Sequence, residues 1–127
     1  MSVEEQWAAG PRVAECERFY AIPDGYPVSE GHTLVVAKRK VPDMLWLCND
    51  ECEELLHFVK EVCAELAMQY DCDGFNIGAN CGASAGQTVM QFHLHIIPRY
   101  KDDGGQPGGV RHVLPGGDWR GRCTESS

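Results

Sequence analysis

The chain has 127 residues, 43% of them hydrophobic, and a formal net charge of −8 at pH 7. This length supports one hydrophobic core, so we expect a single domain over residues 1–127. No apolar run approaches the roughly 20 residues of a membrane-spanning helix, and the acidic balance disfavours polynucleotides and anionic membranes as partners. The N-terminal Met-Ser-Val-Glu-Glu-Gln lacks the basic and apolar regions of a secretory signal, so we expect a cytoplasmic protein.

The seven cysteines, at positions 16, 48, 52, 63, 72, 81 and 123, form no Cys-x-x-Cys pair. Their number is odd and their spacing is irregular. The sequence therefore predicts neither a disulfide framework nor a ribbon-type zinc site.

The first predicted elements are extended segments. Residues 1–11 carry no strong period, and we expect a loosely held arm there. Residues 13–22 are predicted to be extended up to the Pro-Asp-Gly turn at 23–25. Thr33–Ala37 is rich in β-branched residues and is predicted to be a central strand.

A long helix is predicted from Asn49 or Asp50 to about Tyr70. Apolar residues at helical spacing mark the face that we expect to cover the sheet. They are Cys52, Leu55, Leu56, Val59, Val62, Cys63 and Leu66. The acidic residues Glu51, Glu53 and Glu54 are interpreted as a solvated face on the other side.

The second half of the chain holds the most informative stretch. A strand is predicted over residues 75–79, and a loop of small residues, Asn-Cys-Gly-Ala-Ser-Ala-Gly, follows at 80–86. Residues 90–97 then alternate, with Met90, Phe92, Leu94 and Ile96 on one face and Gln91, His93 and His95 on the other. Residues 101–127 are interpreted as a Gly-rich tail with a short extended segment over 110–114. The fold class is therefore α+β.

His93 and His95 are candidates for phosphate chemistry. Residues two apart in a strand are about 6.6 Å apart, so the two imidazoles can flank one small anionic group. The His93/His95 pair alone could also be a metal half-site or two exposed polar residues without a function. The preceding loop favours a functional role, because Gly82 and Gly86 let backbone N–H groups approach a ligand, and Gln87 and Thr88 add side-chain donors.

Two further residues have simple local explanations. His32, just before the strand at Thr33–Ala37, is interpreted as a hydrogen-bonded structural histidine. Asp24 is interpreted as a turn former whose carboxylate accepts hydrogen bonds from nearby backbone N–H groups.

These motifs together resemble the histidine triad (HIT) family of nucleotide hydrolases and transferases over about residues 12–115. The resemblance rests on residues 19–41, on Phe-Asn-Ile-Gly-Ala-Asn-Cys-Gly at 75–82, and on Ala-Gly-Gln-Thr-Val at 85–89 leading into His-Leu-His-Ile-Ile-Pro-Arg at 93–99. The family pattern is His-x-His-x-His, and Gln91 stands at its first position. The resemblance implies an antiparallel sheet covered by one long helix, in a homodimer whose sheet continues across the subunits.

The resemblance also implies roles for residues. His93 matches the nucleophile that attacks the α-phosphorus of a nucleotide, and its other ring nitrogen is held by the main-chain carbonyl of Gln91. His95, Gln87 and Thr88 match groups at the phosphoryl oxygens. Four more positions match as follows: Asp24 with a ribose ligand, Ile22 with the base pocket, Asn80 with a residue near the phosphates, and His32 with a histidine supporting the site.

Three functions remain open. The favoured one is an enzyme that releases a mononucleotide such as AMP from a nucleoside phosphoramidate or a dinucleoside polyphosphate, without a cofactor and with purine preferred by analogy. The second is a nucleotide-binding protein with little turnover because of Gln91. The third is a metalloprotein using His93, His95 and a cysteine. Some relatives hold a structural zinc, but Lys40 stands where they have a histidine, so we expect no metal.

Overall fold

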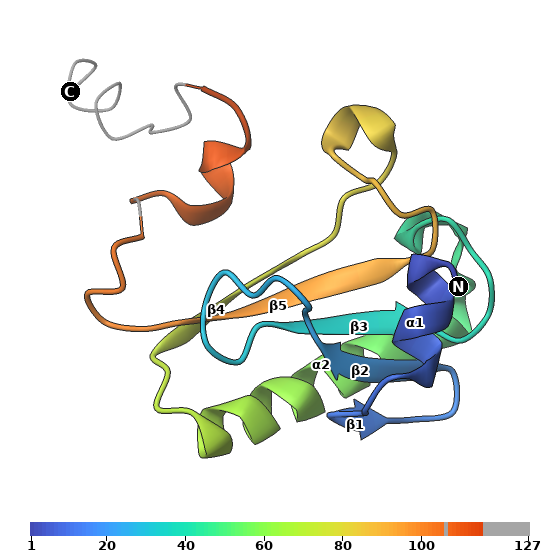
Figure 1. The fold of residues 1–127 in the computed structure, drawn as a ribbon, viewed down its shortest axis with the longest axis horizontal. Helices are drawn as coiled ribbons and strands as arrows, with labels where there is room; N and C mark the ends of the chain where they lie inside the picture. Colours follow the sequence, from blue (N-terminus) through green and yellow to red (C-terminus); the bar gives the residue numbers. More distant parts are fainter. Residues whose placement is uncertain (106, 116–127) are drawn as a thin grey trace.

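The computed structural model describes residues 1–105 and 107–115. Its centre is one antiparallel sheet with strand order β1-β2-β3-β5-β4. The strands are β1 (Ala14–Glu15), β2 (Phe19–Pro23), β3 (Thr33–Ala37), β4 (Gly74–Gly78) and β5 (His93–Arg99). The long helix α2 (Asn49–Gln69) runs along one face, and the short helix α1 (Val3–Ala9) lies in front of the other (Figure 1). The prediction of an α+β fold, with an antiparallel sheet covered by one long helix, is thus confirmed.

Three short 3-10 helices lie in the connections: η1 (Met44–Trp46), η2 (Ala83–Ala85) and η3 (Gly109–Val113). Within the described residues, no helix is long and apolar enough to span a bilayer. Of the predicted Gly-rich tail, residues 106 and 116–127 lie outside the described part, a range that includes Cys123.

Several predicted bounds agree with the structure. The central strand is Thr33–Ala37 as predicted, and the predicted helix ends one residue before Tyr70. The strand predicted at 75–79 is β4, shifted by one residue. These elements have strong local periods, which is why the sequence locates them well.

Three predicted segments differ from the structure. The extended segment over 13–22 is a hairpin of β1 and β2, because the backbone N–H of Cys16 turns back to the carbonyl of Phe19 at 2.9 Å. Residues 110–114 belong mainly to η3 rather than to a strand. The histidine strand starts at His93, so only the later part of the alternating segment has strand geometry.

The expected loose arm contains a helix instead. Ser2 caps α1: its hydroxyl accepts from the backbone N–H of Glu5 at 3.1 Å, and the Glu5 carboxylate accepts from the N–H of Ser2 at 3.1 Å. This is a capping box, and Ser-Val-Glu-Glu at 2–5 carries its sequence signal. The prediction missed it because α1 spans only seven residues, too few for a clear hydrophobic period.

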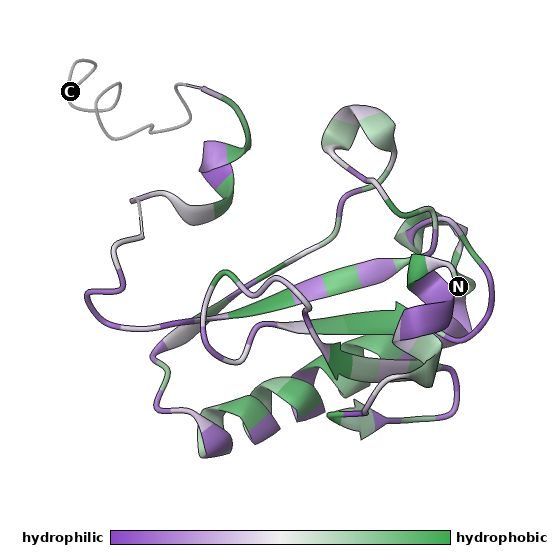
Figure 2. Cartoon of the chain, in the orientation of Figure 1, coloured by the Kyte–Doolittle hydropathy of each residue, from purple (hydrophilic) through white to green (hydrophobic). Residues whose placement is uncertain are grey.

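The main core lies between α2 and the sheet. Leu55, Phe58, Val59, Val62 and Leu66 face the strands. They pack against Phe19, Ala21, Val35, Phe92, Leu94 and Ile96. Two predicted core positions are wrong: Leu56 is 65% exposed and Cys52 is exposed, because the buried stripe is centred on Phe58 instead. Figure 2 shows β3 apolar along its length, whereas polar and apolar residues alternate on β5.

Glu51 does not belong to a solvated face, as the sequence suggested. It is 4% exposed and accepts two hydrogen bonds from the Arg39 guanidinium, at 2.8 and 3.1 Å, and one from the N–H of Cys48 at 2.9 Å. The Arg39 contact and the Cys48 N–H lower the pKa of Glu51 to about 2. This carboxylate therefore ties the start of α2 to the segment that follows β3.

Candidate active site

The pairing of β3 with β5 sets the position of both candidate histidines. His93 lies opposite Val36, and His95 lies opposite Leu34. Directly opposed residues in an antiparallel pair project from the same face of the sheet. Leu34 and Val36 belong to a second apolar cluster, with Tyr20, Ile22 and the partly buried Trp7 of α1. The histidines therefore project from the face that α2 does not cover.

A cleft of about 640 Å³ opens on this face. Most of the predicted ligand-binding residues line it together: Ile22, Asp24, Asn80, Thr88, His93 and His95. They come from β2, from the turn after it, from the loop before β5 and from β5 itself. Its size and its mixed polar and apolar lining suit a nucleotide-sized ligand.

Two glycines shape the loop beside the cleft. Gly82 and Gly86 flank η2 with φ values of 95° and 94°, a conformation that favours glycine. The N–H of Gly86 turns back to the carbonyl of Ala83 at 3.0 Å. The loop is therefore a compact turn, and Gly86 brings main chain to the cleft wall.

Gln87 is not brought into the cleft lining. It is 4% exposed, and its Nε2 donates to the carbonyls of Pro42 at 2.6 Å and Val89 at 3.0 Å, while its Oε1 accepts from the N–H of Gly82 at 2.8 Å. Both amide hydrogens are thus used within the fold. Its side chain braces the glycine loop and has no donor left for a phosphate oxygen.

The main chain determines the tautomer of His93. Its Nδ1 lies 2.8 Å from the carbonyl oxygen of Gln91. A carbonyl oxygen can only accept, so Nδ1 carries the proton and Nε2 of the neutral ring keeps its lone pair. His93 thus offers a nucleophilic nitrogen on the cleft side. The backbone carbonyl of Gln91, as expected, orients the His93 ring.

His32 lies behind His95 and determines its tautomer in turn. The N–H of Val28 donates to Nδ1 of His32 at 3.1 Å, so the proton of neutral His32 is on Nε2. That Nε2 lies 2.9 Å from Nδ1 of His95 and 3.3 Å from the Asp24 carboxylate. When Nδ1 of His95 accepts a hydrogen bond from the Nε2–H of His32, neutral His95 carries its own proton on Nε2. That N–H can donate to a phosphoryl oxygen.

Asp24 combines its turn role with a place in the cleft. One carboxylate oxygen accepts from the N–H of Tyr26 at 2.7 Å, as expected for a turn former. The other lies 3.3 Å from His32 and 3.7 Å from His95. The carboxylate therefore adds negative charge beside both imidazoles while it also borders the cleft.

Burial favours the neutral form of both supporting histidines. It lowers the pKa of His32, and Asp24 acts in the opposite direction. It also lowers the pKa of His95, where His32 and His93 act in the same direction and Asp24 opposes them. Both imidazoles are consequently uncharged at neutral pH, which suits hydrogen bonding more than proton donation.

Asp24, His32 and His95 are the one group of three metal-ligating side chains among the described residues, with ligand atoms within 4.8 Å of one another. A metal would need the lone pair of His32 Nε2, which would move the proton to Nδ1, opposite the N–H of Val28. The donor set therefore favours the hydrogen-bonded arrangement. The expected alternative of His93, His95 and a cysteine is not assembled in the described part of the chain.

The Gln91 side chain is buried away from the cleft lining, at 6% exposure. Its Nε2 donates to the carbonyls of Ala37 and Arg39, both at 2.8 Å, and its Oε1 accepts from the N–H of Val41 at 3.2 Å. The side chain thus fastens the segment after β3 to the start of β5. Gln91 supports His93 through its backbone and the fold through its amide.

Helix α1 supplies a cleft wall that the sequence did not predict. Val3, Gln6 and Trp7 line the cleft, and the Trp7 ring lies 4.9 Å from the His93 ring between centroids. The capping-box signal at residues 2–5 could have located the helix, but no local pattern predicts where the helix docks. A tryptophan near the N-terminus indicates that the segment packs on the domain, but it does not indicate which residues the tryptophan contacts.

The comparisons with known proteins agree with this geometry. A family model described as "HIT domain" matches residues 9–102. The bis(5'-nucleosyl)-tetraphosphatase [asymmetrical] of Schizosaccharomyces pombe is 39% identical over 77 residues, 61% of this chain and 42% of that protein. The AP-4-A phosphorylase of Mycobacterium tuberculosis is 34% identical over 92 residues, 72% of this chain and 47% of that protein.

A crystal structure of a hypothetical histidine triad nucleotide-binding protein from Sulfolobus tokodaii is 39% identical and superposes with a TM-score of 0.73, covering 80% of this chain and 68% of that one. The chain belongs to the HIT domain family. It spans about half to two thirds of the length of the curated relatives it matches. The two curated relatives above are named as a phosphorylase and a tetraphosphatase, whereas other relatives are uncharacterized HIT-like proteins.

Gln91→Ala is expected to lower the free energy of unfolding by about 2–4 kcal/mol, because three buried backbone groups lose their partner and a cavity remains. Urea denaturation at neutral pH measures this. The matched control is Gln69→Ala on the exposed side of α2, expected within about 0.5 kcal/mol of the unmodified chain. Equal stability of the two variants would contradict the bracing role of Gln91.

Stability is expected to fall as the pH drops below 6.5. In the unfolded chain His32 and His95 titrate near 6.5, whereas in the folded protein their pKa values are lower, so the unfolded state binds protons first on acidification. The contribution is fully present above pH 6.5 and is lost toward the lowered pKa values. Chemical denaturation from pH 8 to pH 5 measures it, and His32→Asn should flatten the profile. An unchanged slope in that variant would assign the pH dependence to other groups.

Proposed function

We propose that this protein is a nucleotide hydrolase or transferase that cleaves at the α-phosphate of a dinucleoside polyphosphate or a nucleoside phosphoramidate and releases a mononucleotide such as AMP. The observation that carries the proposal is the fixed tautomer of His93, with Nδ1–H on the Gln91 carbonyl and the Nε2 lone pair directed to the cleft. The named relatives in nucleotide chemistry support the substrate class.

In the first displacement, Nε2 of His93 bonds to the α-phosphorus, and the bond from phosphorus to the leaving group breaks. With a phosphoanhydride, the leaving phosphate keeps the electron pair and needs no proton. With a phosphoramidate, the leaving amine keeps the electron pair and takes up a proton from solvent. The His93 ring retains its Nδ1 proton and therefore becomes a cationic nucleotidyl-imidazolium. Negative charge on the transferring phosphoryl oxygens is stabilised by the N–H of His95, by Thr88 and by backbone of the glycine loop.

In the second displacement, water bonds to the α-phosphorus and the P–N bond breaks. The electron pair returns to Nε2 of His93, and one water proton passes to solvent. The products are the mononucleotide and the original neutral His93. A second nucleophile such as phosphate could replace water, which is why transfer and hydrolysis are both included in the proposal.

The nucleotide is proposed to lie with its base beside Ile22, its ribose at Asp24 and its phosphates near Asn80 and Thr88, all of which line the cleft. Gln87 acts indirectly in this arrangement, because its amide is used to brace the loop. Purine preference is carried by analogy with the relatives.

Gln91 is proposed to replace the first histidine of the triad. The carbonyl that orients His93 is a main-chain group and survives the exchange. The amide side chain makes three hydrogen bonds within the fold, whereas an imidazole has only two ring nitrogens. Gln91→His is therefore expected to loosen the segment after β3 rather than to raise activity by itself.

His93→Ala is expected to reduce AMP release from diadenosine tetraphosphate and from adenosine phosphoramidate by roughly 10³-fold or more, because it removes the nucleophile. The assay is run in EDTA, so that metal-dependent turnover is absent. The matched control is His57→Ala, an exposed histidine on α2, which should keep full activity. Equal turnover by His93→Ala and the unmodified chain would contradict the proposal.

The second candidate function is a nucleotide-binding protein with little turnover, and the observation favouring it is Gln91 at a triad position. Single-turnover labelling separates the two functions. A mononucleotide covalently attached to His93 and then released supports the enzyme. AMP binding without label at His93 supports the binding protein instead.

The protein is also proposed to be a homodimer with a continuous sheet. Among the described residues, β4 is an edge strand whose one partner is β5, and its Ile77 is 44% exposed. Unpaired edges of this kind can pair with a second chain. Sedimentation equilibrium should give twice the monomer mass, and Ile77→Lys should shift the mass toward the monomer. A monomeric unmodified chain at micromolar concentration would contradict this assembly.

A further inference from the structure

Helix α1 forms one wall of the cleft with very few contacts of its own. It has seven residues, and none of them is buried. A helix this short is not stable in isolation, so its place on the sheet depends on the side chains that tie it down. Two residues attach it to the sheet: Trp7 within the helix and Arg12 just after it.

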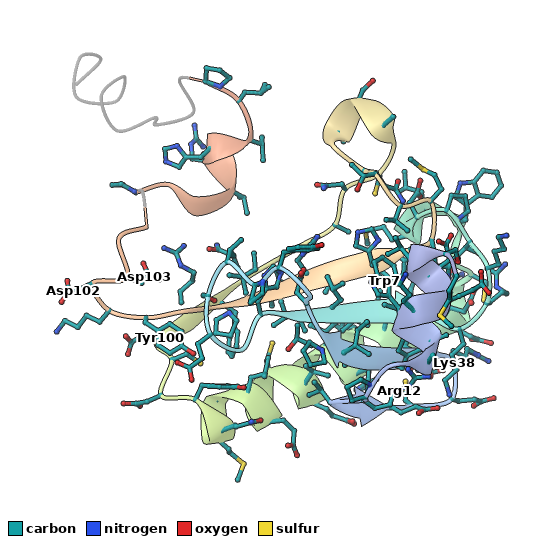
Figure 3. The ribbon with its side chains drawn as sticks, viewed as in Figure 1. Trp7, Arg12, Lys38, Tyr100, Asp102 and Asp103 are labelled. Atoms are coloured by element: carbon teal, nitrogen blue, oxygen red, sulfur yellow. The ribbon has the colours of Figure 1, made fainter. Side chains whose placement is uncertain are left out.

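Trp7 is the apolar anchor. Its indole packs against the cluster of Tyr20, Ile22, Leu34 and Val36 on the sheet face that carries the histidines. The same indole lies 4.9 Å from the His93 ring between centroids, at an interplanar angle of 59°. Figure 3 shows Trp7 reaching from α1 toward the sheet. It therefore contacts the proposed nucleophile directly.

Arg12 is the polar anchor at the end of α1. Its Nη1 donates to the carbonyl of Trp7 at 3.1 Å and to that of Gly10 at 3.4 Å. The guanidinium lies 3.9 Å from the centroid of the Tyr20 ring and pairs with Glu15 at 3.3 Å. Carbonyls at a helix C-terminus need such partners, and the stacked guanidinium fixes them to β2.

The contact with Trp7 has a specific consequence for a covalent intermediate. The Gln91 carbonyl keeps the proton on Nδ1 of His93, so a bond from phosphorus to Nε2 gives that ring a positive charge. A cation within about 6 Å of an indole centroid is attracted by the negative face of the ring. The Trp7 ring lies within that range of the His93 ring.

We propose that Trp7 is a positioning residue that stabilises the cationic nucleotidyl-His93 intermediate, and that Arg12 holds it in place through α1. This inference rests on the proposed function, since it needs the covalent intermediate. It assigns the N-terminal helix a role in the chemical step in addition to lining the cleft.

The test is the rate constant of His93 nucleotidylation, measured by single-turnover labelling with diadenosine tetraphosphate. Trp7→Leu should lower that rate constant about 2- to 30-fold, with a smaller change in AMP affinity. Trp7→Phe keeps an aromatic ring with a weaker face and should recover part of the loss. The matched control is Trp46→Leu on η1, which is 67% exposed and should leave the rate constant unchanged.

A second measurement separates charge stabilisation from packing. Tryptophans with increasing fluorination, incorporated at position 7, keep the shape of the indole but weaken its negative face. The nucleotidylation rate constant should fall steadily along that series. Arg12→Gln should lower the rate constant in the same direction, because α1 loses its polar anchor, while circular dichroism should show that the rest of the chain stays folded.

Three results would overturn the inference. The first is that the Trp7→Leu variant nucleotidylates His93 at the rate of the unmodified chain. The second is that Trp7→Leu weakens only AMP affinity and that the fluorinated series shows no trend, which would make Trp7 a wall of the binding cleft. The third is an unmodified chain that forms no label at His93. That result would overturn the proposed function as well, so it is distinguishable from a failure seen only in the Trp7 variants.

Discussion

The antiparallel pairing of β3 with β5 is the constraint on which the site depends. It places His93 opposite Val36 and His95 opposite Leu34, so both imidazoles share the face that α2 leaves open. A slip of one residue in this pairing would turn them toward the α2 core and bring Leu94 out of it. Burial of the apolar residues of β5 therefore fixes the register, and the register places His93 and His95 in the cleft. One face of β5 contributes to the core, and the other face contributes to the candidate site.

Main-chain groups orient both histidines of the cleft. The carbonyl of Gln91 determines the proton position on His93, and the N–H of Val28 does so for His32, which then faces His95. Backbone groups are present whatever the side chain. The orientation of the proposed nucleophile, His93, therefore does not depend on which side chain stands at position 91. Orientation by the main chain also leaves the Gln91 amide available for its three bonds to the segment after β3.

The elements that line the cleft are not all attached to the fold in the same way. β5 is a strand of the sheet and the loop after β2 connects two of its strands, whereas α1 is attached to the sheet through Trp7 and Arg12. A wall attached by two side chains can respond to changes in either one without loss of the core. Sequence changes in the N-terminal segment can thus alter this wall of the cleft while the core of the fold is kept.

Local sequence pattern by itself determined the central strand, the long helix, the glycine loop and the placement of His93 and His95 on one strand face. The strands and the helix repeat with periods of two or about 3.6 residues, and the loop depends on the backbone freedom of glycine. Both kinds of signal come from neighbouring residues in the sequence and do not depend on distant ones. Tertiary structure alone decided that Gln87 faces inward, that Glu51 pairs with Arg39 and that Trp7 reaches His93. Those contacts join residues from separate elements, and only the packing of the sheet against its two helices brings them together.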